Sequence, residues 1–163
     1  MYNAKDVWIS DSCVIIDLFS AGVISHLFSL DYTIKTTDFV VNELISVDES
    51  SLKGFDVVIT SSEEILDLIE IRNNHPGLSI TDISVYYHAN KRGWVIITGD
   101  GALRKFASEK GILVHGTLWI LDEFVEAGCL LPDEAADALN SILNSGGRLP
   151  LEECEKIIKK WLE

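Results

Sequence analysis

Short apolar runs alternate along the first 115 residues with segments in which apolar side chains recur every three or four positions. The short runs indicate buried β-strands, and the periodic segments indicate amphipathic helices. Strands that alternate with helices are typical of a parallel sheet covered by helices on both faces. The expected strands are residues 7–10, 32–36, 56–60, 94–98 and 112–115.

Helices are expected between these strands, and capping residues mark several of their ends. Ser61 and Glu64 have the spacing of a capping box, and Gly93 and Gly111 stand where a helix commonly ends in a left-handed residue. From residue 116 onward the patterning is helical alone. The expected helices are residues 12–22, 23–30, 37–46, 61–74, 79–93, 101–111, 117–128, 132–146 and 150–163.

The chain is expected to form one domain over residues 1–163, with an α/β core at 1–115 and a helical tail at 116–163. No apolar run approaches the roughly 18 residues that span a bilayer, and no signal peptide is expected at the N-terminus. The three cysteines are widely spaced, which excludes a disulfide framework and fits a reducing compartment. A cytoplasmic location without membrane contact is therefore expected.

The formal net charge is −13, from 13 basic and 26 acidic residues. So acidic a chain is not expected to bind duplex nucleic acid through a broad basic surface. Residues 91–110 differ, because five basic side chains stand there against two acidic ones. This window is a candidate phosphate-binding patch, although ordinary solvated helix faces have the same composition.

Two acidic residues stand just after expected strands, each at the turn into a helix. Asp11 comes directly after the strand at 7–10, and Asp100 follows the strand at 94–98 after one glycine. Ligands of open parallel sheets bind at the carboxyl ends of the strands. Each residue is also placed to cap the next helix, an interaction worth about 0.5–2 kcal/mol. Both together at one edge favour a bound cation, since unpaired carboxylates repel each other.

Glu43 and Asp82 are the other two candidates. Glu43 lies along the apolar stripe of the helix expected at 37–46, so it either reaches the edge of that stripe or meets a cation. Asp82 has capping-box spacing with Ser79, which is a purely structural alternative. The four acids form an all-oxygen set, which suits Mg²⁺ or Mn²⁺ and the hydrolysis of phosphodiesters.

Other catalytic motifs are poorly matched. The sequence has no Walker A motif, no dinucleotide-binding glycine motif and no nucleophile elbow. Cys13 is expected to be a buried structural thiol, and Asp17 is expected to face solvent. A response-regulator phosphoacceptor would need a lysine after the last strand, where His115 and Gly116 stand instead.

Four segments resemble, in order, the motifs of the PIN-domain family of metal-dependent nucleases, which includes the VapC-type toxins. They are WISDSCVIIDL with Asp11, VVNELI with Glu43, ITDISVYYHA with Asp82, and VIITGDGALRKFA with Asp100. The tail segments VHGTLWILDEFVEAGCL and GGRLPLEECEKIIKKWLE are similar to those of a narrower, mostly uncharacterised PIN-like group. Gly101 departs from the toxins, which usually carry a polar or acidic residue there, so an auxiliary metal contact is expected to be missing.

The resemblance implies a three-layer α/β/α sandwich with a central, mainly parallel sheet and a helical C-terminal extension. It also implies a divalent-metal-dependent endoribonuclease that uses Mg²⁺ or Mn²⁺. The main metal ligands would be Asp11, Asp82 and Asp100, and Glu43 would bind metal or orient the attacking water.

Supporting roles follow from the same resemblance. Thr98 and Ser12 would position the ligands through hydrogen bonds. Four residues would contact phosphates of the RNA substrate: Lys91, Arg92, Arg104 and Lys105. The alternative is a PIN-like protein-interaction module with weakened or no nuclease activity.

The resemblance further implies partners. PIN-domain proteins commonly pair through helices, and a VapC-type toxin would be silenced by a small antitoxin protein. The apolar faces of the helices at 117–128 and 132–146 are extensive, so a homodimer is expected. A monomer whose tail covers the edge of the sheet is the alternative.

Overall fold

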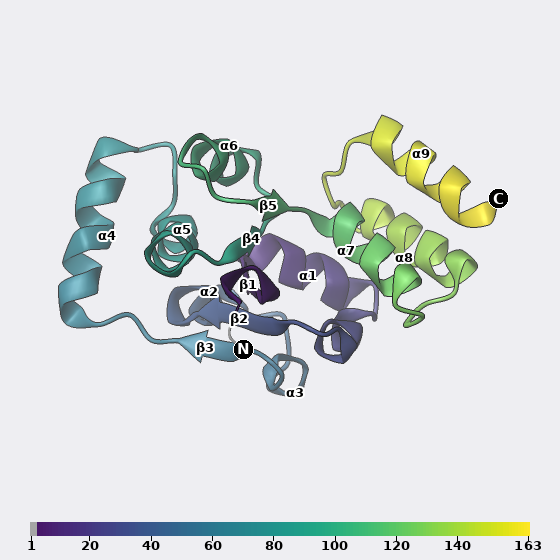
Figure 1. The fold of residues 1–163 in the computed structure, drawn as a ribbon, viewed down its shortest axis with the longest axis horizontal. Coiled ribbons are helices and arrows are strands. Elements are labelled where there is room, and N and C mark those ends of the chain that lie inside the picture. The colour runs from purple at the N-terminus through teal and green to yellow at the C-terminus, as the bar shows by residue number, and fades with distance from the viewer. Residues whose placement is uncertain (1–2) are drawn as a thin grey trace.

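The protein is described here by a computed structural model of residues 3–163. Its sheet has five parallel strands in the order β3–β2–β1–β4–β5 (Figure 1). Helices flank the sheet, which confirms the predicted α/β/α fold. The strands are β1 (Val7–Ser10), β2 (Thr33–Thr37), β3 (Asp56–Val58), β4 (Val95–Ile97) and β5 (Val114–His115).

The predicted helices are present, with ends within a few residues of the expected ones. The Ser61–Glu64 capping box forms, and Gly93 ends its helix with a φ of 73°. The segment expected as a helix at 23–30 is a 3-10 helix, η2 (Ile24–Ser29), and the short helices η1 (Ala4–Asp6) and α3 (Glu49–Leu52) were not predicted. The others are α1 (Ser12–Ser20), α2 (Asp38–Glu43), α4 (Ser62–Asn74), α5 (Ile80–Arg92), α6 (Gly101–Glu109), α7 (Thr117–Glu126), α8 (Pro132–Asn144) and α9 (Leu151–Leu162).

The central strand β1 determines where the chain leaves the sheet next to β4. All four of its residues are buried, because the sheet is covered on both faces. Ser10 is in register with Ile97 of β4, and the Asp11 N–H donates to the Ile97 carbonyl at 3.0 Å. The chain therefore leaves β1 and β4 side by side at the same edge of the sheet.

The helical tail packs onto the α/β core and onto itself. Helix α8 contacts α1, α7 and α9, and Figure 1 shows this group at the opposite end of the molecule from α4. Leu121, Phe124 and Leu139 have no more than 1% of their side-chain surface exposed. Most of the apolar surface that motivated the homodimer prediction is thus covered within the chain.

Exposed apolar side chains lie both in the tail, at Leu151 and Leu162, and around α4, at Ile59, Leu66 and Ile69. None of the helices in residues 3–163 combines the length and the hydropathy that crossing a bilayer requires.

Candidate active site

The four predicted acids are carried by four different helices. Asp11 is the N-cap of α1 after β1, and Asp100 is the N-cap of α6 after β4. Asp82 lies in the first turn of α5, and Glu43 is the last residue of α2. The capping alternative is therefore correct for Asp11 and Asp100, since their side chains accept from the Val14 and Leu103 N–H groups at 3.0 and 3.2 Å.

Asp11 is fully buried and holds three hydrogen bonds. Besides the Val14 N–H, its carboxylate accepts from the Thr98 hydroxyl and from the Gly99 N–H at 3.2 Å. Burial nevertheless raises the pKa of Asp11 to about 6, against the lowering effect of these donors. The nearby Asp100 charge raises that pKa further. Capping alone does not require such burial, so Asp11 stays a candidate site residue as well as a cap.

Asp82 lies close enough to Asp100 for the two carboxyls to interact directly. Partial burial raises the pKa of Asp82 to about 7, and the Asp100 charge is the next largest cause. Asp11 adds to the rise, whereas a hydrogen bond from Ser79 opposes it. Ser79 also accepts from the Asp82 N–H at 3.1 Å, which is half of the predicted capping box. Three carboxyls therefore share one electrostatic environment.

Glu43 reaches the same edge from α2, with its side chain exposed to solvent. Its carboxylate accepts from the Thr81 hydroxyl at 2.7 Å and from the Ser12 hydroxyl at 3.4 Å. Thr81 precedes Asp82 and Ser12 follows Asp11, so Glu43 connects the helices that carry both acids. Glu43 thus lies at the edge of its apolar stripe and also faces the acids.

Thr98 connects the two central strands through one hydroxyl group. This hydroxyl donates to Asp11 and accepts from the Asp100 N–H at 2.9 Å, and the residue is fully buried. The Thr98 hydroxyl therefore links the Asp11 carboxylate to the start of α6, alongside the hydrogen bond from the Gly99 N–H.

Replacing Thr98 by valine tests that link. Valine has nearly the same shape but removes one of the three donors to the Asp11 carboxylate and leaves the Asp100 N–H without its hydroxyl acceptor, so we expect the unfolding free energy to fall by about 1–3 kcal/mol. Thr98→Ser should retain most of the stability, because it keeps the hydroxyl. Urea unfolding of the three proteins measures the difference; equal stability of Thr98→Val and the native protein would show that the hydroxyl has no structural role.

Two predictions near the acids are wrong. Cys13 is exposed rather than buried, and Asp17 is half-buried rather than solvated, accepting from the Thr117 hydroxyl at 3.2 Å. Although the residue reaches the surface, protein atoms exclude part of the water around its thiol; this desolvation first, and then the charges of the surrounding acids, raise the pKa of Cys13 to about 12, so the thiol is protonated at neutral pH. The i, i+4 spacing of Cys13 and Asp17 on one helix face was the signal that could have placed Asp17 here.

The predicted phosphate contacts separate into two groups. Lys91 pairs with Glu64 at 3.2 Å and Arg92 contacts the His88 Nδ1 at 3.0 Å, both at the far end of α5. That end lies about 15 Å along the helix from Asp82. Arg104 is near the acids, since its guanidinium donates to the Thr98 carbonyl at 3.4 Å. Lys105 is exposed on the same helix, α6.

The donor set suits a hard divalent cation, since it consists of carboxylates that repel one another. Within residues 3–163, however, no group of three His, Cys, Asp or Glu side chains already has the spacing of a metal site. Burial first and then the Asp100 charge raise the pKa of Asp82, and a cation at this edge would offset the repulsion between the two carboxylates.

Comparison with known proteins agrees with this arrangement. The structure is similar to the crystal structure of PAE2754 from Pyrobaculum aerophilum, with a TM-score of 0.55 and 18% sequence identity over 73% of this chain and 96% of that chain. This likeness concerns the fold. No curated protein matches the sequence. A sequence profile described as a PIN domain matches residues 7–163, tail included. The chain therefore belongs to the PIN-domain family.

Proposed function

We propose that this protein is a divalent-metal-dependent endoribonuclease. PIN domains are generally nucleases, and they usually use divalent metals. The observation that carries the proposal for this chain is the meeting of Asp11, Asp82 and Asp100 at one sheet edge, where burial first and then their mutual charges raise the pKa values of Asp11 and Asp82. Titratable groups with strongly shifted pKa values at a sheet edge are candidates for catalysis.

The site residues have two kinds of proposed role: some would bind the metal ion, and others position the metal ligands or the attacking water. Asp82 and Asp100 would hold Mg²⁺ or Mn²⁺ together with Asp11, and the ion would supply positive charge that activates water and stabilises the leaving oxygen. Thr98 holds the Asp11 carboxylate in place from behind. Glu43 is oriented by Thr81 and Ser12, so it is placed to accept a proton or a hydrogen bond from an attacking water.

A protein-interaction module without nuclease activity is the second candidate. Two observations favour it: the described acids lack ready metal-site spacing, and Gly101 offers no side chain beside Asp100. Such a module would keep the acids as helix caps alone.

Cleavage of RNA by the purified protein separates the two candidates. We expect cleavage of a single-stranded RNA with Mn²⁺ or Mg²⁺, and none in EDTA. Either ion should also raise the melting temperature, because it binds the native state. If neither ion produces cleavage and neither raises the melting temperature, the interaction module is favoured.

The remaining partners stay predictions. A small antitoxin would be found as a protein that copurifies with this chain and inhibits its cleavage. A homodimer would have to use surfaces other than the buried faces of α7 and α8, and the exposed side chains around α4 are available for it. The cytoplasmic location also stays a prediction.

A further inference from the structure

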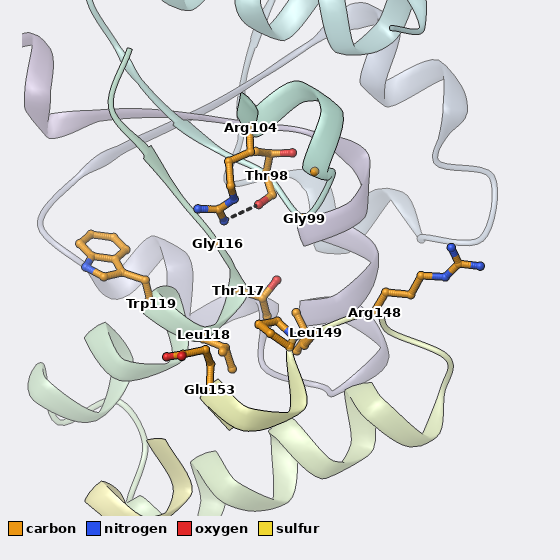
Figure 2. A pocket seen from close by; sticks show the side chains of 12 residues that line it. Thr98, Gly99, Arg104, Gly116, Thr117, Leu118, Trp119, Arg148, Leu149 and Glu153 are labelled. Carbon is orange, nitrogen blue, oxygen red and sulfur yellow. Dashed lines mark hydrogen bonds between the residues drawn. The ribbon is translucent and has the colours of Figure 1, made fainter. Parts of the chain in front are cut away.

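The C-terminal tail forms one wall of a pocket beside the acids. This tail pocket has a volume of about 440 Å³ and lies between the turn after β4, the start of α7, and residues 148–153 (Figure 2). Pockets that bind small ligands usually measure about 300–1,000 Å³. The tail pocket is therefore large enough for one nucleotide.

The lining combines apolar groups with two arginines, Arg104 and Arg148, and one acid, Glu153. Leu118, Trp119 and Leu149 form an apolar wall, and Arg104 lies across from them (Figure 2). Gly116 makes room for Arg104, since a Cβ atom there would lie 2.5 Å from a guanidinium nitrogen. A ligand with a flat apolar part and a negative charge fits this lining.

A second hollow joins the tail pocket to the acids. This acid groove measures about 330 Å³ and is lined by Cys13, Asp17 and Asp100 on one side and by the tail on the other. Gly99 and Arg148 line both hollows. A ligand in the tail pocket can therefore continue past Arg148 to the acids.

Arg148 is the basic residue at this junction. It is exposed, and within residues 3–163 it makes no hydrogen bond or ion pair. Figure 2 shows its side chain extending away from Trp119. Asp17 and Asp100 line the acid groove together with Arg148, but neither carboxylate forms an ion pair with it. An unpaired guanidinium between two hollows suits a phosphate that spans them.

We propose that the tail pocket binds one unpaired nucleotide of an RNA strand, adjacent to the phosphate that enters the acid groove, and that Arg148 contacts the phosphate between them. This proposal rests on the proposed nuclease function and names its substrate class as single-stranded RNA. A base held in a duplex is stacked and paired, so it would have to be flipped out before it could enter the pocket. An unpaired strand exposes its bases for apolar contact and its phosphates for arginine.

Binding measured without metal tests the proposal independently of cleavage. Fluorescence anisotropy in EDTA is recorded with one labelled RNA, as a single strand and as a duplex. Arg148→Gln should weaken binding of the single strand about tenfold, the usual scale for losing one charge-assisted hydrogen bond. It should also reduce the slope of log K against log salt by about 0.7, corresponding to one phosphate contact. Lys159→Gln on α9 removes the same charge from an exposed site outside the pocket and should change neither quantity.

A second variant tests occupancy of the pocket itself. No atom lies within 4 Å of a Cβ built at Gly101, so Gly101→Leu fits the fold while adding bulk at the pocket's rim. We expect about tenfold weaker binding of the single strand without a lower melting temperature. Ala102→Leu is the matched control, because this neighbouring exposed residue does not line the pocket.

The outcomes separate the pocket from the nuclease function. Weaker binding by both variants supports the nucleotide pocket, even if the native protein cleaves no RNA with Mn²⁺. If the native protein cleaves RNA but both variants bind the single strand like the native protein, the pocket proposal is wrong and the nuclease function stands. Tighter binding of the duplex, or no binding of either RNA, also overturns the pocket proposal and would point to a protein segment as its occupant.

Discussion

Replacing Asp82 by asparagine is expected to reduce metal-dependent RNA cleavage about a thousandfold while the protein stays folded. The variant loses an anionic oxygen that would hold the cation. It keeps the Asp82 N–H that Ser79 accepts at 3.1 Å, so the start of α5 is retained. It also removes a charge that Asp100 disfavours. The unfolding free energy should therefore change by less than about 1 kcal/mol.

The measurement is the initial rate of cleavage with Mn²⁺, together with urea unfolding in EDTA. Asp137→Asn serves as the control, because it removes the same charge from an exposed position of α8. The control should cleave RNA at the native rate. If Asp82→Asn cleaves RNA at the rate of the control, Asp82 is not a metal ligand and its role is limited to the start of α5.

The fold was predictable because its local signals agree with one another. The expected strand at residues 94–98 is apolar up to its last residue, and the helices on either side of the strands carry recognisable caps at Ser61 and Gly93. The short elements α3 and η1 were missed, since three or four residues are too few to show a period. The 3-10 geometry of η2 was missed as well, because apolar periodicity does not distinguish it from an α-helix of the same length.

The positions of site residues were predictable where the order and direction of the strands determine them. They were not predictable where they depend on how helices and the tail pack. Asp11 and Asp100 had to meet because parallel strands place their carboxyl ends at one edge. Lys91 and Arg92 are close to Asp100 in sequence, yet they lie in the last turn of α5, at the end opposite to Asp82. Arg148 had no signal at all, since its position depends on how the tail folds back onto the sheet edge.

The stability of the metal-free protein should rise as pH falls from 8 to 5. Burial raises the pKa of Asp11 from 3.8 to about 6 and that of Asp82 to about 7. A carboxyl with a raised pKa in the folded state contributes stability that is complete below its unfolded value and is lost as pH rises through the folded value. The full shift of Asp11 corresponds to about 3 kcal/mol, of which about 1 kcal/mol should be regained by pH 5.

Other groups set the usable pH window. Burial lowers the pKa of His88, so its protonation opposes folding as pH falls and reduces the observed gain. The hydrogen bond from the Ser61 N–H lowers the pKa of Glu64 to about 2, which costs stability only below the ordinary range of a glutamate. Measurements between pH 5 and 8 therefore report mainly the acids and the histidines.

Comparison with Asp82→Asn isolates the contribution of the acids, because the variant keeps His88 and Glu64 unchanged. Urea unfolding in EDTA should show a smaller gain between pH 8 and 5 for the variant than for the native protein. Added Mg²⁺ should stabilise the native protein most at pH 8, where the carboxyls are ionised and free to bind a cation. Equal pH profiles of the two proteins in EDTA would mean that Asp82 is not crowded by its neighbours, and the case for a cation at this edge would then lose its electrostatic basis.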